Sequence, residues 1–167
     1  MPFSNTTETA QQLRAAQLVE CFDHDYPTYQ YAMVEFFVEH LTDVSRSLGG
    51  DLEQVMVLAI LGQRRLSVLR NAEKKDTSEK EGMSISASRL ADATGIPRET
   101  VRRKLALLKD RGWVVQVADG SWALAPEGAA GETPVRHDLS ALDLRGRQRV
   151  ARLVAALEIM GPRARKR

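Results

Sequence analysis

The stretch 95–108, GIPRETVRRKLALL, constrains the fold more than any other part of this 167-residue chain. Val101, Leu105 and Leu108 recur at helical spacing and predict one apolar stripe. Pro97 suits the first turn of such a helix, because its missing N–H leaves no bond unmade there, and Gly95 suits the turn before it. Like charges on neighbouring helical turns repel each other. The helix carries four cations, Arg98, Arg102, Arg103 and Lys104, with only Glu99 to balance them. This excess of positive charge therefore indicates a partner outside the helix.

Further elements are expected on both sides of this helix. Ser86 is a typical N-cap for a short preceding helix. Asp119-Gly120 is a strong signal for a β-hairpin turn. In chain order, the expected elements are an extended residue at Ile85, a helix over 87–93, a helix from Pro97 to about Arg111, a strand over 113–118 and a return strand over 121–125.

Residues 85–124 resemble a winged helix-turn-helix DNA-binding domain. The matching positions are the core Leu90 with the small Ala91, the turn residues Gly95 and Ile96, the stripe Val101, Leu105 and Leu108, and the entry DRGWV into the hairpin. The resemblance implies a mainly α-helical fold with a small β-hairpin wing, flanked by dimerisation helices. It also implies that the second helix of the motif lies in the major groove, where arginine can pair with guanine.

The resemblance also implies which residues contact DNA. Arg98, Glu99, Arg102 and Arg103 are expected to face the bases, and Thr100 and Lys104 the phosphates. Glu99 could accept a hydrogen bond from cytosine or pair with one of the arginines. Ser86 and Ser88 stand at a helix N-terminus, where free N–H groups bind phosphate. The hairpin tip carries no cation, so we expect a mainly structural wing with Ser121 as a phosphate contact. The alternative is that the cations form exposed pairs with Asp92 and Asp110.

The chain is divided into successive regions by its composition. They are a disordered start over 1–8, a helical core and dimerisation region over 9–71, a charged linker over 72–84, the winged region over 85–126, a loop over 127–137, a dimerisation helix over 138–160 and a basic tail over 161–167. This layout resembles that of MarR-type regulators, which implies a homodimer on a palindromic operator. Packing within the chain is the alternative for the apolar stripe of the last helix, and the tail either touches DNA or is disordered.

Charge and cysteine content bound the function. Residues 85–112 hold seven basic and three acidic residues, residues 138–167 eight and three, while residues 1–50 hold two and seven. This asymmetry favours a polyanionic partner for part of the chain. A single cysteine, no signal peptide and no apolar run of membrane length predict a cytoplasmic protein.

Other chemistries have weaker signals. Cys21 lies among the acidic residues Glu20, Asp23 and Asp25, which disfavour a reactive thiolate, and no second His/Cys pair accompanies Cys21 and His24 at metal-ligand spacing. No cofactor and no catalytic motif is expected. Four aromatic side chains either line an effector pocket for a small molecule or belong to the core: Tyr26, Tyr29, Phe36 and Phe37. The alternative function is a winged-helix module that binds protein rather than specific DNA.

Overall fold

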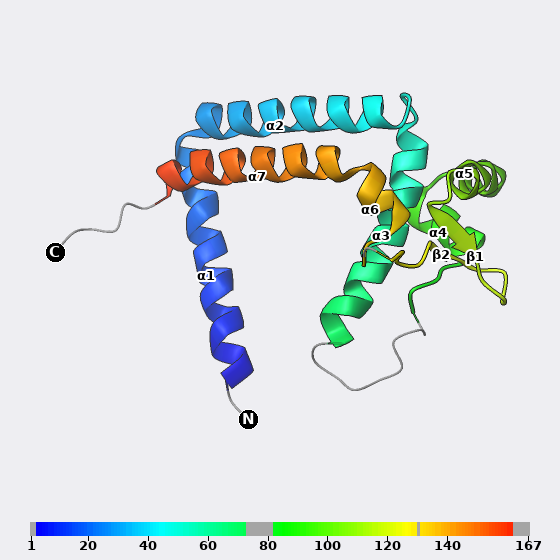
Figure 1. The fold of residues 1–167 in the computed structure, drawn as a ribbon. Helices are drawn as coiled ribbons and strands as arrows, with labels where there is room; N and C mark the ends of the chain where they lie inside the picture. Colours follow the sequence, from blue (N-terminus) through cyan, green and yellow to red (C-terminus); the bar gives the residue numbers. More distant parts are fainter. Residues whose placement is uncertain (1–2, 73–81, 130, 162–167) are drawn as a thin grey trace. The chain divides into compact units, whose positions relative to one another are not determined.

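The computed structural model describes residues 3–72, 82–129 and 131–161, and it is mainly α-helical with one small antiparallel hairpin (Figure 1). Its elements are α1 (Phe3–His24), α2 (Tyr26–Ser47), α3 (Leu52–Ala72), α4 (Ala87–Thr94), α5 (Arg98–Asp110), β1 (Val114–Gln116), β2 (Trp122–Leu124), α6 (Pro134–Asp138) and α7 (Ser140–Met160). No helix in these ranges has an apolar stretch long enough to cross a membrane. The described residues fall into two compact units, one from Met1–Thr42 with Asp143–Arg167 and one from Asp43–Leu142.

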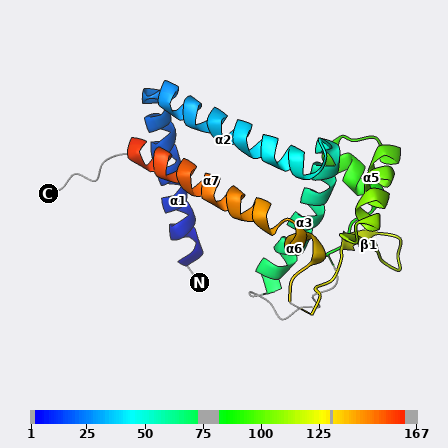
Figure 2. The same ribbon diagram turned by 45° about the horizontal axis from the view of Figure 1, so that its top comes forward.

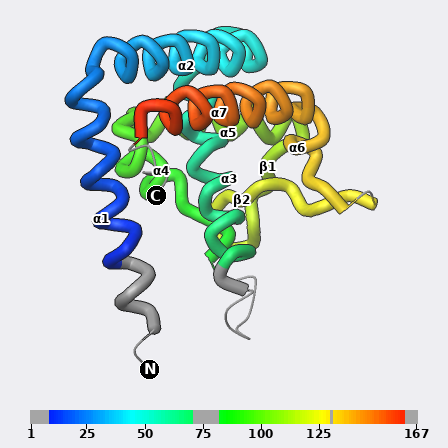
Figure 3. The backbone as a smooth tube through the Cα atoms, turned by 90° about the vertical axis from the view of Figure 1, so that its left-hand side faces the viewer, coloured from blue at the N-terminus to red at the C-terminus, as the bar shows by residue number. Residues whose placement is uncertain are grey.

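In the first unit, α2 and α7 run side by side (Figure 2, Figure 3). Arg152 donates from Nη2 to Glu39 Oε2 at 2.6 Å, and Arg149 Nε lies 3.5 Å from the same oxygen. Glu39 of α2 is therefore paired with two arginines of α7. Gly146 of α7 faces His40 of α2, and a Cβ there would lie in ordinary van der Waals contact with the imidazole, 3.6 Å from its Cε1.

The helix α1 begins at Phe3, so residues 3–8 are helical where the sequence predicted disorder, and residues 1–2 of that segment lie outside the described residues. No glycine or proline occurs between Phe3 and His24, so nothing in the backbone stops the helix at Thr9. Asp25 separates α1 from α2, which starts at Tyr26 with Pro27 in its first turn. Proline is tolerated in the first turn of a helix.

The second unit has the hydrophobic core. α3 packs against α4, α5 and β2, so it belongs with the hairpin region, whereas the sequence grouped it with α1 and α2. The buried side chains at its centre are Val57, Leu61, Leu90, Val101, Leu105, Leu108 and Val114. Val44 and Leu48, in and just after the last turn of α2, complete the same cluster. The helix α3 is therefore a core helix of this unit.

The hairpin joins β1 to β2 with Val114 opposite Leu124 and Gln116 opposite Trp122. Ile85 pairs with Trp122 on the other edge through two hydrogen bonds of 2.9 Å, which confirms the extended residue predicted there. Gly120 has φ +79° at the tip, a left-handed conformation that glycine adopts without strain.

The loop predicted after the hairpin is partly helical. The segment 127–137 was expected to be a loop, but Pro134–Asp138 is the short helix α6. Thr133 caps it by accepting a hydrogen bond from the N–H of Arg136 at 3.4 Å, and Pro134 occupies the first helical position. A Thr-Pro pair at a helix start satisfies both preferences at once.

Candidate nucleic-acid interface

The two faces of α5 differ sharply in burial. Val101, Leu105 and Leu108 are fully buried against the core of the second unit, as the stripe predicted. The side chains predicted to face bases are all exposed: Arg98, Glu99, Arg102 and Arg103. Because the buried stripe fixes one side of the helix to the unit, the opposite side presents three arginines to solvent.

The turn between α4 and α5 is held by its own hydrogen bonds. Gly95 has φ +70° and donates from its N–H to the carbonyl of Ala91 at 2.8 Å. Thr94 donates its hydroxyl to the carbonyl of Leu90 at 2.7 Å and accepts from the N–H of Ile96 at 3.3 Å. Ile96 is buried and anchors the end of the turn in the core. These bonds fix the direction in which α5 leaves α4.

The arginines are only partly neutralised within the chain. Arg102 donates from Nη1 to Glu99 Oε1 at 3.1 Å, so Glu99 takes the pairing alternative in the free protein. Arg98 makes no ion pair with any described residue, and Asp92 and Asp110 pair with none of the three arginines in the described part of the chain. The alternative of exposed pairs with Asp92 and Asp110 therefore does not account for this face.

The predicted phosphate contacts on α4 and α5 are placed differently from one another. Ser86 is exposed and caps α4 by accepting from the N–H of Arg89 at 3.3 Å. Ser88 and Thr100 are half-buried. These three side chains keep some exposure and remain candidates.

Lys104 is a correction. It was predicted to contact phosphate, but only 8% of the residue is exposed. Its Nζ lies 2.6 Å from Asp51 Oδ2 and 3.4 Å from Glu53 Oε2, both at the start of α3. A lysine buried in two ion pairs is not free to reach a phosphate. Asp51 also caps α3, because its Oδ1 accepts a hydrogen bond from the N–H of Gln54 at 2.9 Å.

The ionisation of this pair follows from its contacts. The hydrogen bond to Asp51 is the main cause that raises the pKa of Lys104, burial opposes it, and Glu53 adds to the rise. Burial raises the pKa of Asp51, but hydrogen bonds from Lys104 and from the N–H of Gln54 outweigh it and leave that pKa below its usual range. Both groups are therefore held in their charged forms at neutral pH.

Ser121 is a second correction. Only 8% of the residue is exposed, and its hydroxyl donates to Asp119 Oδ1 at 2.6 Å while its N–H donates to the same oxygen at 2.9 Å. The hydroxyl of Ser121, followed by its N–H, lowers the pKa of Asp119. The hairpin tip is therefore a closed turn with an ionised carboxylate, and Ser121 stabilises the turn rather than offering a phosphate contact.

The aromatic residues suggested as an effector pocket form two separate groups. Tyr29 stacks on Phe22 with ring centroids 4.8 Å apart, and Tyr26 lies 6.3 Å from Tyr29. Phe36 contacts Phe37 at 5.6 Å. Phe36 borders a hollow of only about 60 Å³, so the four side chains do not enclose one pocket.

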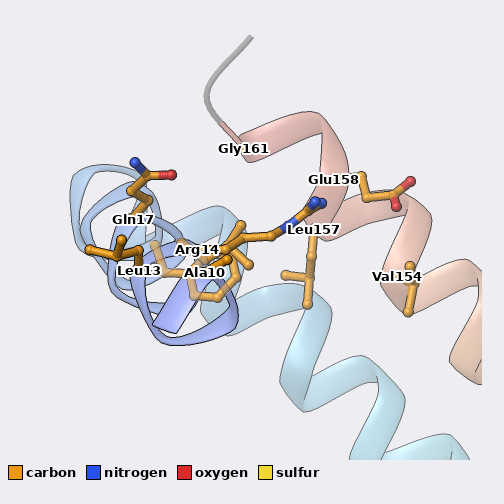
Figure 4. Close-up of a pocket in the computed structure, with 10 residues that line it drawn as sticks. Ala10, Leu13, Arg14, Gln17, Val154, Leu157, Glu158 and Gly161 are labelled. Carbon is orange, nitrogen blue, oxygen red and sulfur yellow. The ribbon is translucent and has the colours of Figure 1, made fainter. Parts of the chain in front are cut away.

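A larger groove in the first unit lies between α1 and α7 (Figure 4). It measures about 720 Å³ and is lined mostly by apolar groups, with Arg14, Gln17 and Glu158 as polar members. Leu13 and Val154 contribute from opposite sides of it. Phe22 borders this groove, but none of the four residues predicted to line an effector pocket does: Tyr26, Tyr29, Phe36 and Phe37.

The remaining candidates can be placed briefly. Cys21 is free and half-buried. In the ranges that the structure describes, no group of three or more His, Cys, Asp or Glu side chains is arranged to hold a metal ion. The basic tail over 162–167 and most of the charged linker, 73–81, lie outside the described residues.

Comparisons of the chain with protein-family models, with curated proteins and with solved structures find no match.

Proposed function

We propose that this chain is a sequence-specific, double-stranded DNA-binding transcription regulator of the winged helix-turn-helix type. In this proposal α4 and α5 form the helix-turn-helix, and β1 and β2 form the wing. The observation that carries it is the exposed row of Arg98, Arg102 and Arg103 on a helix whose opposite face is buried. An α-helix fits the major groove, where arginine donates to guanine O6 and N7.

The wing has a supporting role in this proposal. Its tip carries Asp119 and no cation, so it would be repelled by the phosphates that line the minor groove. Ser86, Ser88 and Thr100 supply the backbone contacts beside α5. Glu99 exchanges its partner Arg102 for a base edge when α5 enters the groove.

The regulator acts as a homodimer in this proposal, since one such motif reads only a few base pairs. The first unit supports self-association, because none of its described side chains is buried. Large apolar residues stand exposed on all three of its helices, among them Leu13, Phe37, Val38, Leu41, Val150, Val154 and Ile159. Exposed apolar surface of this kind favours association in water. A cytoplasmic site of action accompanies this proposal.

A protein-binding module is the second candidate. The exposed apolar residues and the acidic hairpin tip favour it, because neither feature attracts DNA. Salt separates the two candidates: binding through phosphates falls by about a thousandfold or more between ~50 and ~200 mM salt, whereas an apolar interface changes little.

The test is selection of bound sequences from a pool of random duplexes at two salt concentrations. We expect a palindrome whose half-sites lie about one helical turn apart. Arg102→Ala and Arg103→Ala should each weaken binding to it by about 10- to 100-fold and relax the preference at one position. Lys109→Ala, which removes a cation from the last turn of α5, should keep the same preferred sequence.

If no sequence is enriched at either salt concentration, the proposal is overturned. Binding that Arg102→Ala and Arg103→Ala both leave unchanged would instead overturn the assignment of α5 as the reading helix.

A further inference from the structure

Lys104 stands apart from the other cations of α5. The side chain of Arg102 is 54% exposed, whereas that of Lys104 is 10% exposed and points to the start of α3. Taking a charged ammonium out of water is costly unless it is paired and hydrogen-bonded. Its two carboxylate partners, Asp51 and Glu53, provide that pairing.

Asp51 binds two elements at once. Its Oδ1 accepts from the N–H of Gln54 at 2.9 Å and so caps α3, while its Oδ2 accepts from Lys104 at 2.6 Å. The capping bond fixes the carboxylate in place, so its second oxygen offers Lys104 one defined position. Gly49 and Gly50, with φ of +67° and +85°, bring the chain into this corner directly before Asp51.

The pair acts on the orientation of α5. Each residue of a helix is rotated by about 100° from the one before, so the direction of Lys104 sets the directions of Arg102 and Arg103. The apolar stripe sets which side of α5 faces the core, but leucine and valine contacts have no direction of their own and define the rotation less sharply than a hydrogen bond does. A hydrogen-bonded ion pair is directional, and it selects one rotation of the helix.

We propose that the Lys104–Asp51 ion pair fixes the rotation of α5 about its axis and thereby positions the exposed arginines for DNA. Lys104 is a positioning residue and touches no phosphate. This inference rests on the proposed DNA-binding function, and it assigns to Asp51, an acidic residue, a supporting role in binding a polyanion.

The sign of one substitution tests the inference. Asp51→Asn removes a negative charge but keeps an oxygen that can cap α3. If only long-range electrostatics mattered, the variant would bind DNA more tightly. If the pair positions α5, the variant binds more weakly, and we expect a loss of about tenfold.

Lys104→Met gives the second measurement, because methionine retains an unbranched apolar side chain. We expect a similar loss of affinity with an unchanged dependence on salt, because no phosphate contact is lost. A direct phosphate contact would instead reduce the slope of log affinity against log salt by about 0.9 per site. The double variant Lys104→Met/Asp51→Asn should bind no more weakly than either single variant.

The matched control is Lys109→Met, which removes the same charge from an exposed position on the same helix. It should lower affinity less than Lys104→Met, and it should show no coupling to Asp51→Asn. Circular dichroism of every variant checks that the helices are intact.

If the wild type binds DNA and the Asp51→Asn variant binds it equally or more tightly, the positioning role is overturned. The proposed function stays in place. Failure of the wild type itself to bind DNA would overturn both, and the two failures are distinguished by that one measurement.

Discussion

The indole N–H of Trp113 donates to Asp138 Oδ2 at 2.7 Å, across 25 residues of sequence. Trp113 begins the hairpin and is buried, and Asp138 ends α6. The bond therefore ties α6 to the residue at which α5 passes into β1. The backbone N–H of Trp113 donates to the carbonyl of Leu108 at 3.0 Å, and Cζ of Arg111 lies 5.0 Å from the centre of the Trp113 ring. One tryptophan thus joins the end of α5, the hairpin and α6.

Trp113→Phe should destabilise the protein in a pH-dependent manner. The hydrogen bond from Trp113, followed by that from His137, lowers the pKa of Asp138 below its usual 3.8. A carboxyl group whose pKa is lowered by folding stabilises the folded protein at pH values above its usual pKa. This stability is lost as the pH falls through the pKa of the folded state. The difference in unfolding free energy from the wild type should therefore be largest near neutral pH and shrink below pH 3.8.

Urea unfolding at a series of pH values measures this difference. Trp122→Phe is the control, because the indole of Trp122 makes no hydrogen bond to a described residue. Its destabilisation should not depend on pH. A Trp113→Phe deficit that is the same at neutral and acid pH would contradict the assigned role of the bond.

Gly95→Ala should destabilise the second unit by about 1–2 kcal/mol, because alanine is strained in the left-handed conformation. Gly95 has φ +70°, and a Cβ there would meet no atom within 4 Å, so the cost lies in the backbone alone. Gly95→Asn should cost less, since asparagine tolerates this conformation. Gly62→Ala, in the middle of α3 with open space around it, should instead stabilise by up to about 1 kcal/mol. Thermal unfolding of the three variants measures these differences. An unchanged melting temperature for Gly95→Ala would contradict this account.

Leu105→Ala should lower the unfolding free energy by about 2–5 kcal/mol, because Leu105 is fully buried and the substitution leaves a cavity. Leu107, two residues further along the same helix, is 45% exposed, so Leu107→Ala should change stability much less. Chemical denaturation of both variants measures the contrast. Equal losses would mean that the buried face of α5 is assigned to the wrong side.

Local patterns in the sequence are enough to predict α5 and the hairpin. The stripe Val101, Leu105 and Leu108 repeats at helical spacing, and burial follows directly from that spacing. Asp119 and Gly120 specify a turn by their own backbone preferences. Both features depend on residues within a few positions of each other, which is the range that sequence patterns report.

The placement of Lys104 could not be predicted in this way. Its partner Asp51 is 53 residues away, and neither residue differs in type from the exposed charges beside it. Ser121 is a different case, since an aspartate two residues before a serine is a known turn-forming pair that could have indicated a buried hydroxyl. The Thr-Pro start of α6 was likewise a local signal that the composition of the loop obscured.

Val150→Glu/Val154→Glu should convert the proposed homodimer to a monomer. The two valines lie one turn apart on α7, each 47% exposed, so the glutamates should not disturb folding of the single chain. Buried in an interface between copies, two unpaired carboxylates should raise the dimer dissociation constant by about a hundredfold or more. Sedimentation velocity over a range of concentrations measures the shift. Gln148→Glu, at another exposed position of the same helix, should leave the mass of the dimer unchanged.

The Val150→Glu/Val154→Glu variant should lose affinity for a full palindrome but keep its weak affinity for a half-site, because α5 is untouched. A wild type that sediments as a monomer at every concentration, or a double variant that stays dimeric, would show that this face of α7 does not hold two copies together.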